Sequence, residues 1–512
     1  MLSKLIIDSP KYKVLKDFEG LKNPSITTEL LPTLSPEVLE KLSTICPSPS
    51  QEQKTIENVH NTLLEKMPKT DIHVHGETGF LDVETARLLA KRNNCDFPED
   101  LIDKDNNIWK YRGKDDFMQF ILDFLTLSAL IQTPQDIEDV AYAFYKYCYE
   151  NNVIFSLPGI SWVQCMNNMS FPEFNEAYNR ALLRGMNDFG SLSILRLRYY
   201  QERHVDKELF TKTWEQLAAK PNPLITTIGL AGKEEGFPLE DFKEFYLKIK
   251  KLRQESGKPW YFLTAHMEAF SDAKTIREAL NYLDWIAHGR HAAQDLKFVD
   301  ELSSQKIRFE LCPLSDTSVY PNEIPSLHDH KELSILNEKK LISLNSDDPA
   351  FFQGIHVVYK KVFHELPASY SDLLQCTLNG ISSASPQALK EMEQFQKQQF
   401  KDYEKIVDLG LFKVLFFQYY WRLLPLIVNI EAEFAQKLFA IELKTDMHTL
   451  LALSKESADI YPEIQQQLQF LISTKQHIES YYKEVLAKTA EMVEEYSHLS
   501  TVVEENRFSN TF

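Results

Sequence analysis

The chain has 512 residues, of which 43% are hydrophobic and 25% are charged. These proportions are typical of a globular protein with a deep core, so they exclude disordered, collagen-like and disulfide-scaffold classes. The formal net charge is −18, and because nucleic-acid phosphates are also negative, we expect no nucleic-acid partner.

Glycine is scarce and unevenly placed. Only 15 residues are glycine, and 13 of them lie between positions 76 and 380. Because glycine allows tight turns and close backbone approach to ligands, we expect the functional loops in this middle part. The expected domains are an N-terminal helical extension at 1–65, a central domain at 66–388 and a long C-terminal α-helical region at 389–512.

The N-terminal extension contains one clear helix signal. Ser35 and Pro36 are typical of an N-cap and of the first residue of a helix. A helix is therefore predicted within residues 33–45.

Eight short apolar runs follow, separated by longer polar or amphipathic segments. The runs span residues 70–75, 153–157, 192–198, 224–230, 260–266, 283–288, 307–312 and 341–345. Strands that alternate with helices predict parallel βαβ units, and eight such units are typical of a closed (β/α)8 TIM barrel. The expected fold class is therefore α/β. In the long connection after the first run, the apolar segment 117–130 is expected to be a helix at the barrel mouth.

Two segments of the C-terminal region have informative patterns. Residues 464–499 carry seam positions at alternating steps of four and three, and nine of the eleven are apolar. This seam predicts either one long helix packed on its neighbours or a coiled coil that joins chains into a homo-oligomer. The segment from Leu411 to Ile430 has a membrane-like length but contains Lys413 and Arg422. We interpret it as a buried core helix, with a membrane-touching segment as the alternative.

The cysteines and the two chain ends bear on the compartment. Six scattered cysteines without a CxxC pair indicate a reducing environment, and the apolar run at the N-terminus is too short for a secretory signal. We therefore expect a cytoplasmic protein. The glutamate-rich segment 491–506 is interpreted as a solvated helix end, with a C-terminal secretion signal as the alternative.

The predicted strands end in residues that can bind a metal. The first run ends with His73 and His75, the fifth with His266, and Asp347 follows the eighth. Alternate residues of a strand share a face, so His73 and His75 point the same way. Active sites of parallel barrels lie at the carboxyl ends of the strands, and three imidazoles with one carboxylate suit Zn²⁺. We therefore predict one zinc ion bound by these four residues.

Six motifs in this region resemble the adenosine deaminase superfamily of metal-dependent purine hydrolases. In chain order they are MPKTDIHVHGE, LAG, LTAHMEA, IAHG, ELCPLSD and LNSDDPAFF. The resemblance implies hydrolytic deamination of a 6-aminopurine nucleoside or a related purine, in which zinc activates the attacking water and a carboxylic acid protonates purine N1. It also implies catalytic roles for His288 and Asp347, and substrate contacts for Glu77, Gly232 and Asp348 with ribose, purine N3 and purine N7.

The sequence departs from the family pattern at the acid. The family motif His-Ala-Gly-Glu reads here His266-Met267-Glu268-Ala269, so the expected position holds alanine and a glutamate stands one residue earlier. Either Glu268 performs the acid role, or it is a solvated loop carboxylate and deamination is impaired. Because a two-residue step keeps Glu268 on the same strand face as His266, we assign Glu268 the acid role.

Four further departures concern the substrate. They are Gly76, Thr78, Gly229 and Asp316. We expect Gly76 to enlarge the floor of the pocket and Thr78 to narrow its ribose side, so that a substrate other than free adenosine is accepted. Two alternatives stay open: a metal-dependent amidohydrolase or esterase on a non-purine substrate, and an impaired barrel that acts as a binding or regulatory protein through its helical tail.

Overall fold

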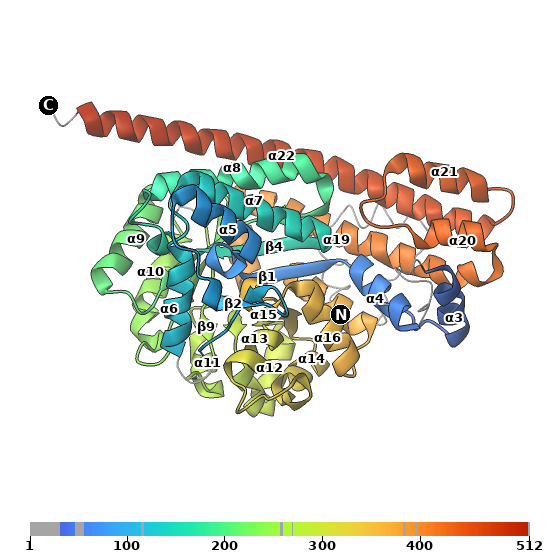
Figure 1. The fold of residues 1–512 in the computed structure, drawn as a ribbon, viewed down its shortest axis with the longest axis horizontal. Helices are drawn as coiled ribbons and strands as arrows, with labels where there is room; N and C mark the ends of the chain where they lie inside the picture. Colours follow the sequence, from blue (N-terminus) through green and yellow to red (C-terminus); the bar gives the residue numbers. More distant parts are fainter. Residues whose placement is uncertain are drawn as a thin grey trace.

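Parallel strands form the centre of the computed structural model (Figure 1), which describes residues 31–46, 56–113, 117–255, 260–268, 270–381, 386–394 and 398–509. One arc of the barrel pairs, in order, β1 (Lys69–His75), β4 (Val153–Ile160), β6 (Leu197–Glu202), β7 (Ile225–Ala231) and β8 (Phe262–Leu263), with β5 (Ile194–Leu195) beside β4. The other arc pairs β9 (His266–Met267), β10 (Ile286–His288), β11 (Phe309–Leu311) and β12 (Ile342–Leu344).

The two arcs meet at both edges. Val74 in β1 forms a parallel bridge with Asp347, which follows β12. At the other edge, β8 and β9 are two parts of one strand interrupted at Thr264 and Ala265; β7 pairs with the first part and β10 with the second. All eight predicted runs contain strands, so the predicted α/β (β/α)8 TIM barrel is confirmed.

Helices cover the outside of the barrel because its strands are buried on both faces. Thr133 and Ser170 form capping boxes at the starts of two of these helices, with proline at the first position of one helix and at the second position of the other. The covering helices include α5 (Val83–Asn93), α7 (Pro134–Glu150), α8 (Phe171–Phe189), α9 (Lys207–Ala219), α10 (Lys243–Leu252), α11 (Ala273–Ala279), α12 (Leu296–Gln305), α14 (Lys331–Glu338), α16 (Ile355–Glu365) and α17 (Tyr370–Ile381).

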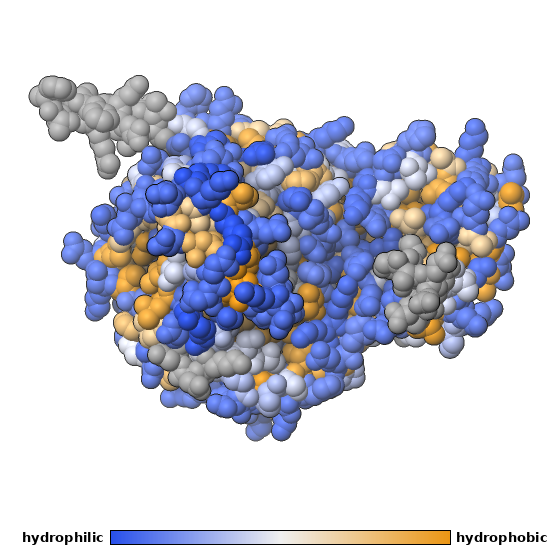
Figure 2. Space-filling model, in the orientation of Figure 1, coloured by the Kyte–Doolittle hydropathy of each residue, from blue (hydrophilic) through white to orange (hydrophobic). Residues whose placement is uncertain are grey.

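The long connection after β1 contributes a helix to the barrel mouth. This helix, α6 (Phe117–Ser128), confirms the helix predicted at 117–130. Phe120 and Phe124 are buried on its inner side, whereas Met118 and Leu122 are exposed. Figure 2 shows hydrophobic residues exposed on this face of the barrel. The hairpin of β2 (Ile102–Asp103) and β3 (Ile108–Trp109) lies in the same connection.

The N-terminal helix is also present as predicted. It is α3 (Pro36–Ile45), where the Ser35 hydroxyl accepts a hydrogen bond from the Val38 N–H at 3.3 Å. A second helix, α4 (Ile56–Lys66), leads into β1. Residues 1–30 and 47–55 of the predicted extension lie outside the described residues.

The C-terminal region is helical and ends in one very long helix. Its elements are α18 (Pro386–Gln394), α19 (Gln398–Leu423), the 3₁₀ segment η9 (Leu424–Asn429), α20 (Ala432–Phe439), α21 (Met447–Ser457) and α22 (Pro462–Ser509). Figure 1 shows α22 running along one side of the molecule, where it packs on α19, α21 and α8. The seam residues from Ile464 to Tyr496 are buried in these contacts except for the half-buried Met492. The intramolecular interpretation of the seam therefore holds up to Tyr496, and the side chain at position 499 lies outside the described residues.

The apolar segment of α19 packs as a core helix. Among the described residues, only the stretch Lys401–Asn429 is long and apolar enough to cross a membrane by length and composition, and 72% of its most apolar window is buried inside the protein. Lys413 is buried there, and its ammonium donates to the Leu192 carbonyl at 2.6 Å. Burial lowers the pKa of Lys413 well below its usual range. These contacts agree with the interpretation as a core helix.

Candidate active site

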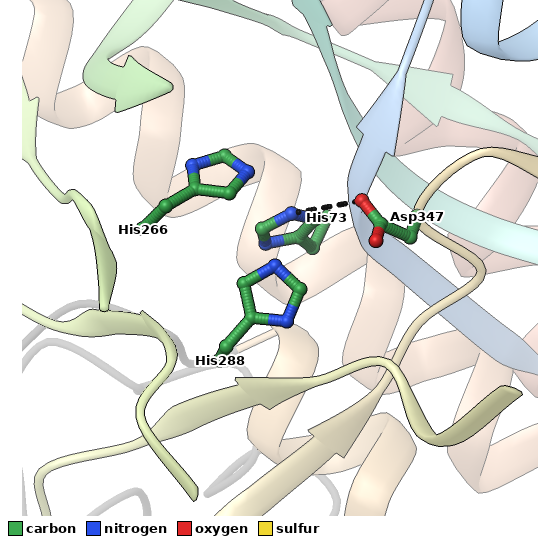
Figure 3. A group of neighbouring side chains, drawn as sticks. All are labelled: His73, His266, His288 and Asp347. Carbon is green, nitrogen blue, oxygen red and sulfur yellow. Dashed lines mark ion pairs between the residues drawn. The ribbon is translucent and has the colours of Figure 1, made fainter. Parts of the chain in front are cut away.

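Four buried side chains meet at the carboxyl ends of the strands. Figure 3 shows His73, His266, His288 and Asp347 pointing toward one another, and one ligand atom from each lies within 4.8 Å of the others. His73 Nε2 is 3.3 Å from Asp347 Oδ1. Among the described residues, neither His73 Nε2 nor either nitrogen of His288 has a hydrogen-bond partner. Buried polar atoms normally have partners, so this set of nitrogens and one carboxylate fits a metal such as zinc.

His75, the fourth predicted ligand, lies beside this group. Its Nε2 is 3.4 Å from Asp347 Oδ1, and it forms a second close group with Asp347 and Asp348. The structure therefore brings all predicted ligands around Asp347. It also places His288, for which the resemblance implies a catalytic role, in the group whose ligand atoms lie within 4.8 Å of one another.

The backbone at the site is held in an uncommon conformation. Asp347 has a φ of 62° and His288 a φ of 56°, both in the left-handed region that residues other than glycine rarely adopt. Such backbone strain concentrates at functional sites because the surrounding fold must maintain it. Burial alone would raise the pKa of Asp347, but the close imidazoles of His73 and His75 hold it well below its usual range.

Glu310 is hydrogen-bonded to His73, a role that was not predicted from the sequence. Its carboxylate accepts from His73 Nδ1 at 3.0 Å, from both terminal nitrogens of Arg198 at 2.8 and 2.5 Å, and from Trp285 Nε1 at 2.6 Å. Burial alone would raise the pKa of Glu310, but Arg198 and His73 lower it. With Nδ1 donating to a carboxylate, Nε2 of His73 remains free to bind a metal. The sequence signal that could have revealed this pair is a charged residue in each of two predicted strands, Glu310 in one and Arg198 in the other.

Glu268 points into the cavity next to these residues. Its Oε1 is 3.2 Å from His288 Nε2, and its Oε2 accepts a hydrogen bond from the Tyr320 hydroxyl at 2.6 Å. Its side chain is only 22% exposed, which does not match a solvated loop carboxylate. Ala269, at the family's acid position, lies outside the described residues.

The cavity has an apolar wall and a carboxylate-rich wall. The apolar wall is formed by α6 through Phe117, Phe120, Ile121, Phe124 and Leu125. Five carboxylates line the remainder, and no lysine or arginine lines it in the described part of the chain; the carboxylates are Glu77, Glu202, Glu268, Asp347 and Asp348. Gly232, with a φ of 89°, also lines the cavity. All the predicted substrate-contact residues are therefore present there.

Two of these carboxyl groups are strongly affected by burial. Burial raises the pKa of Glu77 to about 8 and that of Asp348 to about 7. The Glu77 carboxylate accepts a hydrogen bond from the Ser161 N–H, whereas Asp348 Oδ1 has no partner among the described residues. Asp348 lines the cavity and has hydrogen-bonding capacity that the described residues do not use.

The expected effects of Gly76 and Thr78 on the pocket are wrong. A Cβ at Gly76 would lie 2.9 Å from Pro158 Cβ, so this glycine permits packing against β4. The Thr78 hydroxyl is 2.7 Å from that of Ser128 in α6. Neither position lines the cavity, because Gly76 faces β4 and Thr78 faces α6 of the insertion. Asp316 is a buried partner of His330 Nε2, at 3.0 Å.

Gly229 makes room for an aromatic ring beside His75. A Cβ there would lie 2.6 Å from Tyr200 Cε1, and a Cβ at Gly159 would collide with the opposite edge of the same ring. Tyr200 stacks on His75 with ring centroids 5.0 Å apart and an interplanar angle of 26°. The two glycines therefore seat a tyrosine that supports the His75 imidazole.

Comparison with known proteins identifies the family of the chain. Residues 68–395 match the family model described as adenosine deaminase. An adenine deaminase of Wolinella succinogenes is 26% identical over 339 residues, which cover 65% of this chain and 96% of that protein. An adenine deaminase of Saccharomyces cerevisiae is 28% identical over 315 residues, covering 59% of this chain and 86% of that protein. The crystal structure of an adenine deaminase from Arthrobacter aurescens covers 66% of this chain and 99% of that chain with a TM-score of 0.54 and 23% identity. The chain therefore belongs to the adenosine deaminase family of metal-dependent hydrolytic deaminases.

Proposed function

We propose that the chain is a zinc-dependent deaminase that replaces the 6-amino group of an unphosphorylated purine, a base or a nucleoside, by oxygen and releases ammonia. The observation that carries the proposal is the placement of Glu268, whose carboxylate faces the cavity 3.2 Å from His288 beside the His/Asp cluster. Membership of the adenosine deaminase family and relatives named adenine deaminases support a purine as the substrate.

The residues divide the reaction between them. His73, His75, His266 and Asp347 would hold the zinc, which when bound lowers the pKa of water so that a nucleophile is available at neutral pH. Asp347 takes up the proton of the attacking water, and His288 orients that water. Four of these groups have ligand atoms within 4.8 Å of one another, and His75 Nε2 is 3.4 Å from Asp347 Oδ1.

Glu268 acts on purine N1, next to the carbon that the water attacks. It delivers a proton to ring N1, so that the negative charge that develops on the ring during attack at C6 is neutralised. Asp348, which lines the cavity, contacts N7, and the backbone at Gly232 contacts N3. The apolar wall of α6 covers the ring face and excludes water.

The charge of the cavity argues against a nucleotide. A substrate phosphate would meet acidic side chains and no lysine or arginine lining the described cavity. Two of these carboxyl groups have raised pKa values and are only partly ionised at neutral pH, so the main obstacle is the lack of a cation to pair with the phosphate in a partly desolvated site. Lys233, which lines the adjoining cavity, is already paired with Glu235 at 3.0 Å. Sugar hydroxyls, in contrast, donate hydrogen bonds well to Glu77, Glu202 or the carbonyl oxygen of Gln164, which line the same wall.

The test is turnover of a panel of purines by the zinc-loaded protein. Adenine, adenosine, deoxyadenosine, adenosine monophosphate and N6-methylated analogues are compared by ultraviolet absorbance and by ammonia release. We expect kcat/KM for adenine or adenosine to exceed that for the monophosphate by about 100-fold or more. No turnover of any purine would refute the proposed activity, and a preference for the monophosphate would refute the unphosphorylated substrate.

Replacement of the acid separates purine deamination from other hydrolysis. Glu268→Ala should lower kcat by about 10²- to 10⁴-fold, because ring protonation is lost. Glu278→Ala, which removes a carboxylate that is 60% exposed on α11, serves as the matched control and should leave kcat unchanged. An active enzyme that tolerates Glu268→Ala would favour a hydrolase that acts on a non-purine substrate.

A further inference from the structure

We propose that Glu234 is a positioning residue that holds the chain after β9 in the conformation that directs Glu268 into the cavity. The inference rests on the proposed function, in which Glu268 is the acid. It also addresses how the acid acts from position 268 when the family pattern places it one residue later.

Glu234 accepts hydrogen bonds from three groups of the loop that carries Glu268. Its Oε2 accepts from the N–H of Glu268 at 2.9 Å and from the N–H of Phe270 at 3.3 Å, and its Oε1 accepts from the Ser271 hydroxyl. Glu234 itself lies in the loop after β7, two residues beyond Gly232. One carboxylate therefore ties the loop after β9 to the loop of the neighbouring strand.

The anchor is needed because β9 is very short. Its pairing with β10 consists of Ala287 with His266 and His288 with Met267, so the strand ladder ends one residue before Glu268. A buried main-chain N–H beyond the end of a strand needs another acceptor, and Glu234 supplies it. The main chain two residues before Glu268 is held too, since the Arg203 guanidinium donates to the His266 carbonyl at 2.5 Å.

The side chain of Glu268 is held separately from its main chain. The Tyr320 hydroxyl donates to Oε2 at 2.6 Å, which leaves Oε1 directed at His288. Tyr320 is in turn packed under the Arg290 guanidinium, 4.9 Å from the ring centroid. Glu234 thus fixes the main chain of Glu268, and Tyr320 fixes the direction of the Glu268 carboxylate.

The decisive test is a double-mutant cycle between Glu234 and Glu268. Glu234→Ala should lower kcat by about 10²-fold, the effect of misplacing a catalytic group by about 1 Å, while KM changes by less than about threefold. Because the loss acts through Glu268, adding Glu234→Ala to Glu268→Ala should cost nothing more. Equal losses in both backgrounds, or an unchanged kcat in Glu234→Ala, would overturn the inference.

Two matched variants separate positioning from folding. Glu234→Gln keeps one acceptor oxygen and should recover part of the lost kcat, whereas Glu235→Ala, at the next and 61% exposed glutamate, should behave as wild type. The zinc content and the unfolding midpoint should be the same in these two variants and in Glu234→Ala. A loss of kcat that follows a loss of zinc or of stability would also overturn the positioning role.

A crystal structure of Glu234→Ala tests the inference without activity. We expect the Glu268 carboxylate to leave His288. If it stays at the 3.2 Å separation, Glu234 does not position it. A wild-type protein that deaminates no purine would refute the proposed function, and this structural result would still decide the role of Glu234.

Discussion

Replacing Glu310 by glutamine tests whether the carboxylate that is hydrogen-bonded to His73 Nδ1 controls metal binding. In the native network, two carboxylate oxygens receive four N–H groups from His73, Arg198 and Trp285. A glutamine offers one oxygen, and its NH2 group faces donors on the other side. In the variant, His73 Nδ1 therefore lacks a carboxylate acceptor, and Arg198 becomes a buried cation without its counter-charge.

The two consequences differ in size. Loss of the partner that orients a metal-binding histidine typically lowers metal affinity by about 10- to 100-fold. Removing one member of a buried ion pair typically lowers the free energy of unfolding by about 3–5 kcal/mol. Because Arg198 is completely buried, we expect the upper half of that range for Glu310→Gln in the metal-free protein.

A double variant separates the two effects. Arg198→Leu with Glu310→Leu removes the charge pair together, which is often nearly neutral for stability, although Trp285 Nε1–H then lacks a partner at about 1–3 kcal/mol. Most of the stability should return, whereas zinc affinity should stay low because His73 Nδ1 still has no acceptor.

Competition with a chromophoric chelator gives the zinc affinity, and urea unfolding of the metal-free protein gives the stability. The control is Glu301→Gln, since this glutamate is 50% exposed and its partner Arg277, at 2.7 Å, is 42% exposed; it should change the free energy of unfolding by less than about 1 kcal/mol. A zinc affinity of Glu310→Gln within twofold of wild type would refute the reasoning, and so would recovery of zinc affinity in the double variant.

Three further predictions concern the metal, the C-terminal helices and pH. Dialysis against a strong chelator should abolish deamination, and Zn²⁺ but not Mg²⁺ should restore it, because imidazole ligands suit zinc; restoration by Mg²⁺ would contradict the site. A chain ending at residue 390 should be insoluble and inactive, since it loses the hydrogen bonds that Lys413 donates to the Leu192 carbonyl and that Arg196 donates to the Thr489 hydroxyl; a soluble, active fragment would contradict this. Burial alone would lower the pKa of His330, but Asp316 and Glu332 raise it to about 9. Its stabilisation should therefore be complete below about pH 6.5 and disappear as the pH rises through 9, and urea unfolding of His330→Leu should lack that loss.

The fold could be predicted because it depends on local patterns. Each of the eight apolar runs contains a strand of the structure, since period and spacing alone identify βαβ units. The histidines and Asp347 could be predicted for the same reason, because strand ends in a parallel barrel converge wherever the strands lie.

Residues that act through partners across the barrel could not be predicted in this way. Arg198 and Glu310 are 112 positions apart in the chain, and their pairing depends on which side chains point inward at the same height of the barrel. Glu234 and Tyr320 contact Glu268 only because of the particular course of their loops. Gly76 was misjudged because the pattern does not show whether a residue after a strand faces the cavity or the neighbouring β4.

The packing of the Tyr200 ring makes the residues at positions 159, 200 and 229 depend on one another. A side chain at Gly159 or Gly229 requires a smaller residue at 200, and a smaller residue at 200 leaves a void beside His75. Single changes at any of the three are therefore penalised, and only joint changes keep the barrel floor filled. Laboratory evolution that samples one substitution at a time would leave this part of the barrel unchanged, whereas libraries that vary the three codons together could reach a differently shaped floor.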